Sequence, residues 1–375
     1  MGMIVNLITR PEHKIVGLSR YDRSIYPYIS KKATVNIFSV KPLPIPQGIV
    51  KLFNLAGLDP LTATTNYPFY LKPKPREGIW HFTSQTLALI LNFTRPSESI
   101  VTVHDIIPFI TRHDKEISLF NRFEKFLDYL SMQGLKKAKR IITDSEYSKK
   151  TLIKYRDYPG ERIDVIYLGI DHDKFKVIKN SRKKLEKYGI ENECTSVLYV
   201  GSEMPRKNLQ TLIKAFYKLK KKISNARLIK VGEHQAPEAR ERLKILITEL
   251  GLQNDVVFTG YVSEEDLPLF YNAADLFVQP SLYEGFGLPI LEAMACGTPV
   301  VSSNATSLPE VVWDAGIMVD PKDADGFVKA MYEVLTNDGL RENIIKKGLE
   351  RAKMFTWKKT AEETLKVYEK MEEVE

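Results

Sequence analysis

Two carboxylates, Glu284 and Glu292, stand eight residues apart around a Gly-x-Gly loop that leads into a short apolar segment. From 288 to 297 the only charged side chain is Glu292, and a carboxylate in a buried helix needs hydrogen-bond partners. The hydroxyl groups of a bound ligand would supply them. Gly285 and Gly287 allow close approach to the backbone, and the following helix directs free N–H groups at that place. The pattern predicts a site for an anion such as the diphosphate of an activated sugar.

The boundaries of this short helix can also be predicted. Pro289 is suited to a first helical turn, where its missing N–H costs nothing, and Gly297 is a plausible end. A Gly-x-Gly pair alone would equally fit a plain strand–loop–helix crossover. Here Glu-x7-Glu, the intervening Gly-Phe-Gly-Leu-Pro and the following Ala-Cys-Gly-Thr-Pro-Val-Val occur together. In this combination the sequence resembles the retaining glycosyltransferase family 4, and in particular its mannosyltransferase-like members.

The resemblance implies a GT-B fold, with two doubly wound Rossmann-like domains facing each other across a cleft. It also implies that Glu284 lies near the donor sugar, that Glu292 binds the ribose, and that the loop between them covers the diphosphate. The implied catalytic residues are His104, Glu284, Lys207 and Arg206. The implied donor-binding residues are Gly17, Gly232, Tyr261, Val262, Gly285, Phe286, Gly287, Leu288 and Glu292.

A basic loop at 203–208 follows an apolar strand and a glycine. The resembled family places two cations here against the diphosphate, and Lys207 matches one of them. Ser202 stands at the position of the second cation, so we expect Arg206 to supply that charge instead. The alternative is that the loop is a solvated basic turn without a ligand. If no metal neutralises the leaving diphosphate, such a cation is chemically necessary.

We expect no metal and no cofactor. The sequence contains no Cys/His cluster with zinc spacing. Asp-x-Asp strings occur at 171–173 and 323–325, at an expected linker and in the first turn of an expected helix. Acidic residues are favoured in a first helical turn by the helix dipole, so we interpret both strings as structural.

His104 ends an apolar strand, where ligands of doubly wound sheets bind. An isolated histidine at a strand end can be purely structural. The pattern His-Asp-x-x-Pro at 104–108 is similar to mannosyltransferases of the family, in which the histidine touches the donor sugar. In the first loop the resemblance that assigns Gly17 to donor binding is weaker, because the family has a pair of glycines there and this chain has only one.

The elements that must position these residues alternate between strand and helix patterns, which favours parallel sheets. We predict domains at 1–172 and 195–355, a linker at 173–194, and a final helix at 356–375 that crosses back to the first domain. The predicted strands of the first half are Met3–Thr9, Val35–Val40, Ile79–Phe82, Ile100–His104, Arg140–Thr143 and Ile163–Tyr167. Those of the second half are 197–200, Arg227–Val231, Val256–Gly260, Leu276–Gln279, Pro299–Ser302 and Ile317–Val319.

Charge is unevenly distributed along the 375 residues. Residues 1–190 hold 32 Lys+Arg against 18 Asp+Glu, whereas residues 191–375 hold 23 against 29. This suggests that the first half meets an anionic partner, although solvated surface charge is the alternative. No apolar run is long enough to span a bilayer, and two distant cysteines indicate reduced thiols. We therefore expect a cytoplasmic protein, peripheral at the inner face of the membrane.

The predicted activity is transfer of a hexose, with mannose from GDP-mannose preferred, to a glycan or lipid-linked acceptor. Within enzymes the alternatives are a UDP-sugar-dependent glucosyl- or N-acetylhexosaminyltransferase, or a non-transferring relative such as an epimerase or phosphorylase. A non-catalytic protein that binds nucleic acid or another anion is the alternative from a different class. Because aromatic residues are not interleaved with the basic ones as stacking platforms, we expect no nucleic-acid partner.

Overall fold

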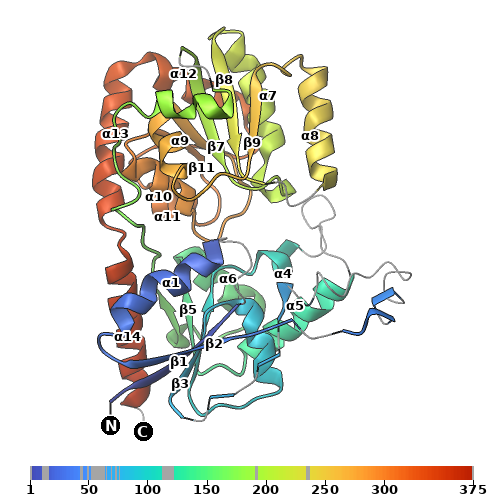
Figure 1. Ribbon diagram of the computed structural model, residues 1–375, viewed down its shortest axis with the longest axis vertical. Helices are drawn as coiled ribbons and strands as arrows, with labels where there is room; N and C mark the ends of the chain where they lie inside the picture. The colour runs from blue at the N-terminus through green and yellow to red at the C-terminus, as the bar shows by residue number, and fades with distance from the viewer. Residues whose placement is uncertain are drawn as a thin grey trace. The chain divides into compact units, whose positions relative to one another are not determined.

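The computed structural model describes residues 2–10, 17–42, 45–48, 50–51, 64, 66–68, 70–71, 74–75, 77–111, 122–190, 193–233 and 237–373. The chain divides into two units, one made of Met1–Gly169 with Trp357–Glu375 and the other of Ile170–Thr356. Figure 1 shows a sheet flanked by helices in each of them. The sequence from 41 to 77 is rich in Pro and Lys and predicts an irregular stretch with one short helix at 49–56. Most of this stretch lies outside the described residues.

The first unit is built on a six-stranded parallel sheet with the order β2-β1-β3-β4-β5-β6. Its central strands are largely apolar and are buried on both faces, as expected for a parallel sheet covered by helices. The chain order reverses between β1 and β3, so the loops that leave these two strands diverge. The strands are β1 (Ile4–Thr9), β2 (Thr34–Ser39), β3 (Ile79–Phe82), β4 (Ser99–Val103), β5 (Arg140–Thr143) and β6 (Ile163–Val165).

The C-terminal helix belongs to the first unit, where it packs against the first helix (Figure 1). A buried hydrogen-bond chain fastens it: the two ring nitrogens of His81 lie 2.6 Å from Tyr368 Oη and 2.7 Å from Thr102 Oγ1. Burial lowers the pKa of His81 to about 3, so the ring is neutral and can donate with one nitrogen and accept with the other. The helices of this unit are α1 (Gly17–Ile29), η1 (Gln85–Asn92), α4 (Ile107–Thr111), α5 (Arg122–Leu135), α6 (Glu146–Arg156), η2 (Gly160–Arg162) and α14 (Trp357–Glu372).

The second unit is also built on a six-stranded parallel sheet, with the order β12-β11-β10-β7-β8-β9. Numbered from its own first strand this is the 3-2-1-4-5-6 order of the Rossmann fold. The order reverses between β7 and β10, which are hydrogen-bonded neighbours. The strands are β7 (Thr195–Val200), β8 (Ala226–Val231), β9 (Val256–Gly260), β10 (Leu276–Gln279), β11 (Val300–Ser303) and β12 (Ile317–Val319).

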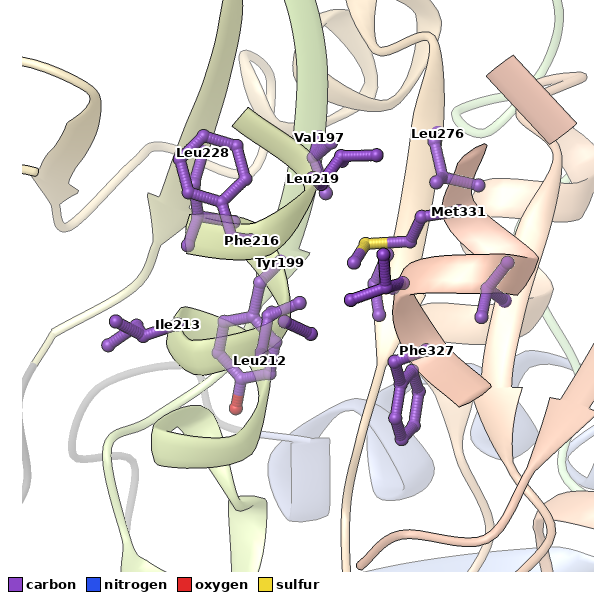
Figure 2. Close-up of a cluster of buried hydrophobic side chains, with 14 of the residues drawn as sticks. Val197, Tyr199, Leu212, Ile213, Phe216, Leu219, Leu228, Leu276, Phe327 and Met331 are labelled. Carbon is purple, nitrogen blue, oxygen red and sulfur yellow. The ribbon is translucent and has the colours of Figure 1, made fainter. Parts of the chain in front are cut away.

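One apolar layer of the second unit lies between this sheet and the helices α7 (Leu209–Lys220) and α12 (Ala324–Thr336). Apolar residues recur at three- and four-residue spacing in both helices, so each presents one apolar face. Figure 2 shows Phe216 of α7 and Met331 of α12 among strand residues such as Val197 and Leu276. Each large side chain buried here contributes roughly 1.5–3 kcal/mol relative to exposure, so this layer holds the sheet and its loops in place.

The interval 173–194, predicted as a linker, is part of the second unit in the structure. Its anchor is Arg182, whose guanidinium donates to the carbonyls of Ala273 and Cys194 and pairs with Asp275. Sequence alone did not reveal Ala273 and Asp275 as partners, because they lie 91 and 93 residues from Arg182 in the chain. The remaining helices of this unit are η3 (Arg182–Tyr188), η4 (Pro205–Lys207), α8 (Pro237–Glu249), α9 (Leu267–Ala273), α10 (Leu288–Ala295), α11 (Leu308–Val312) and α13 (Asp338–Lys353).

All twelve predicted strands are confirmed, with ends that differ by at most two residues. Apolar residues at three- and four-residue spacing predict a helix at 117–138. It is confirmed as α5 from residue 122, and its first residues lie outside the described part of the chain. Residue type and position predict helix caps at Ser145 and Asn208. Ser145 does cap α6, since its Oγ accepts from Ser148 N at 3.1 Å. Asn208 does not cap α7 through its side chain. It has left-handed backbone and its amide donates to the carbonyls of Pro280 and Pro321 instead.

Candidate active site

In the second unit the loops after β7 and β10 leave neighbouring strands at the point where the strand order reverses. Ligands of doubly wound folds bind at such a switch point, beyond the carboxyl ends of the strands. The two loops are joined by hydrogen bonds: Leu282 N donates to Arg206 O at 2.8 Å, and Asn208 Nδ2 donates to Pro280 O at 2.9 Å. The basic loop and the Glu284 loop, 77 residues apart in sequence, therefore form one structure.

Lys207 and Glu284 form the central ion pair at this edge of the sheet. Lys207 Nζ donates to both carboxylate oxygens of Glu284, at 2.7 and 2.9 Å. Arg206 Nη1 lies 3.6 Å from Glu284 Oε2 and donates to Tyr283 O at 3.3 Å. The structure thus brings together three of the four residues assigned to catalysis from the sequence: Arg206, Lys207 and Glu284. The role of Arg206 as the substitute for Ser202 stays a prediction.

Glu284 is buried but held as a carboxylate. Gln279 Nε2 and Ser281 Oγ each donate to its Oε1 at 2.7 Å, in addition to Lys207. Burial acts to raise the pKa of Glu284, but the charges of Lys207 and Arg206 and these hydrogen bonds outweigh it, so the pKa lies below its usual value. The site therefore holds a fixed negative charge and two cations that are already positioned.

The loop that carries Glu284 is rigid for local reasons. Thr306 Oγ1 accepts from Glu284 N, and Ser307 Oγ lies within hydrogen-bond distance of the carbonyls of Glu284 and Phe286. Gly287 has φ +113°, and a Cβ there would lie 2.8 Å from Leu308 Cδ2, so a glycine is required. The loop then enters α10 at Leu288, with Pro289 in the first turn and Gly297 in left-handed conformation just past the end, as predicted.

Phe286 was assigned to donor binding, and its ring is buried against Phe355 at a centroid distance of 6.0 Å. Any contact with a ligand would therefore come from its backbone. Gly285, Phe286, Gly287 and Leu288 lie together at the N-terminus of α10, where the helix dipole and free N–H groups favour an anion.

Glu292 is buried inside α10, as the sequence suggested. One partner of this carboxylate is a protein hydroxyl: Tyr271 Oη donates to Glu292 Oε2 at 2.6 Å. Ligand hydroxyls were the expected partners, and Tyr271, which lies on α9, was not foreseen from the sequence. Binding of the ribose by Glu292 stays a prediction.

The remaining donor residues of the second unit follow β8 and β9. Gly232 N donates to Gly260 O at 2.9 Å, and a Cβ on Gly232 would lie 2.9 Å from Gly201 O. The turns after β7, β8 and β9 are therefore in close backbone contact. Beyond Gly260, Tyr261 is exposed and Val262 is buried, so their backbone groups differ in access to a ligand.

A buried ion cluster beside these turns was missed in the sequence analysis. Glu203 Oε1 lies 2.7 Å from Lys230 Nζ and 2.6 Å from Arg240 Nη1, and the side chains of Glu203 and Lys230 are almost completely buried. Burial lowers the pKa of Lys230, although Glu203 opposes the shift. A lysine inside the apolar strand Ala226–Val231 was the signal that could have revealed it. The cluster ties the turn after β7 to β8 and α8.

His104 of the first unit follows β4 and is buried. Its Nδ1 lies 2.6 Å from Asp144 Oδ2 and its Nε2 lies 3.0 Å from Thr83 O. Both partners are acceptors, so the doubly protonated ring satisfies both. Burial acts to lower the pKa of His104, but Asp144 and the Thr83 carbonyl raise it above its usual value. Both ring nitrogens of His104 therefore already have protein partners, and neither is free to hydrogen-bond a sugar.

Other candidates of the first unit are placed as follows. Gly17 begins α1, and residues 11–16 before it lie outside the described part of the chain. Asp105 Oδ1 accepts from Ile107 N and so begins α4, a structural role for the aspartate of the His-Asp-x-x-Pro pattern. Asp144, which pairs with His104, follows β5 and was not singled out from the sequence.

Among the described residues there is no group of three or more His, Cys, Asp or Glu side chains that could hold a metal ion. The two Asp-x-Asp strings have local roles: Asp171 accepts backbone N–H groups in a turn, and Asp323 caps α12. No helix in the described part of the chain is long and apolar enough to cross a bilayer.

Comparison with known families agrees with this geometry. Residues 180–351 match the family described as Glycosyl transferases group 1, and residues 79–174 match Glycosyltransferase Family 4. The chain is 36% identical over 279 residues to the O-antigen chain mannosyltransferase B of Escherichia coli, covering 73% of this chain and 71% of that protein. The chain therefore belongs to this glycosyltransferase family, and it is a hexosyltransferase.

Two further proteins are similar to the chain. It is 31% identical over 271 residues to the serotype-specific mannosyltransferase WbdA of Escherichia coli, covering 71% of this chain but only 32% of that longer protein. Among solved structures, sucrose-phosphate synthase from Thermosynechococcus elongatus matches all of both chains with a TM-score of 0.77 and 22% identity. That likeness establishes the GT-B fold.

Proposed function

We propose that this glycosyltransferase transfers mannose from GDP-mannose to a glycan or lipid-linked acceptor, with retention of the anomeric configuration. The observation that carries the proposal is the Lys207–Glu284 pair, with Arg206, at the switch point of the second unit. Cations and helix N–H groups together are what a departing nucleoside diphosphate requires. The choice of mannose is supported by the likeness to two mannosyltransferases.

In the proposed reaction the bond between the anomeric carbon and the diphosphate oxygen breaks, and a bond to an acceptor oxygen forms on the same face. The acceptor hydroxyl proton passes to the departing phosphate oxygen. Lys207 and Arg206 stabilise the charge that develops on the diphosphate, together with the N-terminus of α10. Glu284 orients Lys207 and lies near the donor sugar, and Glu292 binds the ribose. His104 lies beside the sugar, with its ring nitrogens held by Asp144 and the Thr83 carbonyl. No metal is required in this scheme.

Ligand-induced stabilisation tests the donor. GDP-mannose, GDP, UDP-glucose and UDP are compared by thermal unfolding and calorimetry, because a ligand that binds only the folded state stabilises it in proportion to its affinity. We expect GDP-mannose and GDP to stabilise the protein more than the uridine compounds. Stronger stabilisation by UDP-glucose would replace the donor with a UDP-sugar and leave the transferase reaction intact. Release of sugar without transfer to any acceptor glycan would contradict the reaction itself.

We also propose that the basic first half of the chain holds the protein at the anionic cytoplasmic face of a membrane, where a lipid-linked acceptor would be found. Residues 1–190 carry 32 Lys+Arg against 18 Asp+Glu, and both cysteines are free and buried, as in reduced proteins. Co-sedimentation with phosphatidylglycerol vesicles should be strong at low salt and lost near 1 M salt, where the Debye length is about 3 Å. Absence of binding at low salt would favour a soluble acceptor.

A further inference from the structure

Asp22 is a half-buried carboxylate on α1 to which neither the fold nor the proposed transfer gives a role. Its Oδ1 is covered by protein atoms and has no hydrogen-bond partner. Such atoms are uncommon in folded proteins, and each costs about 1–3 kcal/mol. An uncompensated carboxylate is a typical feature of a binding site in which the ligand completes the hydrogen bonding.

The position of Asp22 is that of a site residue. The carboxylate lies within hydrogen-bond reach of the Thr83 hydroxyl, directly after β3, and it is close enough to Arg10, directly after β1, for their charges to interact. These two strands are neighbours at the switch point of the first unit. His104, after β4, also interacts with the charge of Asp22. Residues that follow three neighbouring strands of the sheet, β1, β3 and β4, therefore lie around one carboxylate. This is the edge at which a doubly wound sheet binds its ligand.

The protein does not satisfy this carboxylate. The Thr83 hydroxyl has a single proton and also lies 3.2 Å from the Ile8 carbonyl, so it can donate to only one of the two at a time. His104 donates elsewhere, to Asp144 and to the Thr83 carbonyl. Burial raises the pKa of Asp22 to about 7, against the opposing effects of Thr83, His104, Arg10 and Arg23. By contrast, Glu284 has enough donors to lie below its usual pKa.

We propose that Asp22 binds a sugar substrate, its carboxylate accepting a hydrogen bond from a hydroxyl group of the hexose. This rests on the proposed function, because it requires a hexose at the carboxyl edge of the first sheet. A carboxylate is an acceptor only, which matches the donor capacity of a sugar hydroxyl. The hexose is either that of the donor or that of the acceptor.

The test compares the wild type with Asp22→Asn and Asp22→Ala. In the donor arm, calorimetry gives the ratio of the Kd for GDP to the Kd for GDP-mannose, which isolates the sugar. In the acceptor arm, NMR titration with methyl α-D-mannopyranoside is carried out in the presence of GDP. We expect Asp22→Ala to weaken sugar binding roughly tenfold or more in one arm while the Kd for GDP is unchanged. The arm that responds identifies the source of the hexose.

Monodeoxy forms of the responding sugar, lacking the 2-, 3-, 4- or 6-hydroxyl, sharpen the assignment. In the wild type, loss of the contacted hydroxyl should weaken binding about tenfold, whereas in Asp22→Ala the same loss should have no further effect. A side chain with a purely structural role would not give this coupling. Glu161→Gln removes an exposed carboxylate from the same unit and should behave like the wild type in both arms.

The inference is overturned if Asp22→Ala and Asp22→Asn bind both sugars as the wild type does. It is also overturned if neither sugar contributes to binding in the wild type. Failure of the proposed donor gives a different result: UDP then binds more tightly than GDP, and the donor arm is repeated with UDP and UDP-glucose. Thermal unfolding confirms that the variants fold, and removal of a poorly satisfied carboxylate is expected to preserve stability.

Discussion

Glu284 of the second unit and Asp22 of the first are both carboxylates at the switch point of a six-stranded parallel sheet. Burial acts in the same direction on each, since it disfavours the charged form. Glu284 receives hydrogen bonds from Lys207, Gln279 and Ser281, and its pKa is lowered. Asp22 has an oxygen without a partner, and its pKa is raised to about 7.

The difference shows that the number of hydrogen-bond donors around each carboxylate, and not how deeply it is buried, decides its charge state. In the second unit the protein supplies the partners before any ligand arrives, which suits a site that must hold two cations ready for a diphosphate. In the first unit the protein leaves hydrogen-bonding capacity unused, which suits a site that recognises hydroxyl groups. Four experiments can break or sharpen this contrast.

The largest effect is expected from Lys207→Met. Loss of one partner from a buried ion pair costs about 3–5 kcal/mol of unfolding free energy, because Glu284 then lacks its nearest cation. Turnover should fall about 10²–10³-fold with the loss of charge stabilisation at the diphosphate. Urea denaturation and a transfer assay measure the two quantities.

Two further variants make the Lys207 experiment specific. Lys207→Met combined with Glu284→Gln should recover most of the stability but none of the activity. Lys218→Met removes a lysine from an exposed pair with Asp325 and should change stability by less than about 1 kcal/mol. An unchanged stability of Lys207→Met would show that the pair does not hold Glu284 as described.

Glu292→Gln tests a third carboxylate, for which the sequence predicts ribose binding. A hydrogen bond to a charged group contributes about 1.5–3 kcal/mol, so donor affinity measured by calorimetry should fall roughly tenfold or more. Tyr271→Phe removes the protein donor to the same carboxylate and should leave the ribose contact in place. If the Kd for the donor is the same in Glu292→Gln and the wild type, the assignment of Glu292 to the ribose is wrong.

Asp22→Asn should alter the pH dependence of stability. With a pKa of about 7 in the folded state, above the unfolded value near 3.9, Asp22 binds its proton more tightly when folded. Its contribution to unfolding free energy therefore decreases as pH rises from about 4 to about 7. Relative to the wild type, Asp22→Asn should gain roughly 1–2 kcal/mol at pH 8 and little at pH 4, allowing for solvent screening.

Denaturation midpoints at the two pH values check this expectation. The contribution of Glu284 to unfolding free energy depends on pH in the opposite direction. Its lowered pKa favours the folded state at neutral pH, and that advantage is lost in acid. An equal effect of Asp22→Asn at pH 4 and pH 8 would remove the electrostatic contrast between the two sites.

The smallest effect is expected from removal of divalent metal. Because Lys207 and Arg206 are proposed to neutralise the diphosphate, turnover should be the same with and without EDTA. Loss of activity in EDTA that Mn²⁺ or Mg²⁺ restores would mean that cationic side chains do not suffice in the second unit.

Much of the fold was determined by the sequence itself. Most of the strands are short runs of largely apolar residues, and burial of such runs is a local requirement that can be recognised in the sequence. The ends of α10 follow from Pro289 and Gly297, whose backbone preferences are intrinsic. The Glu284 loop was identifiable because its chemistry lies within one continuous segment.

Only the tertiary structure decided which side chains meet. Lys207 and Glu284 are 77 residues apart, His104 and Asp144 are 40 apart, and sheet topology brings each pair together. Asp22 was invisible in the sequence because a helical aspartate is normally solvated, and only its neighbours across β1 and β3 leave it half-buried and incompletely paired. Periodicity encodes which face of an element is buried, whereas the charge state of a buried group depends on donors contributed by distant parts of the chain.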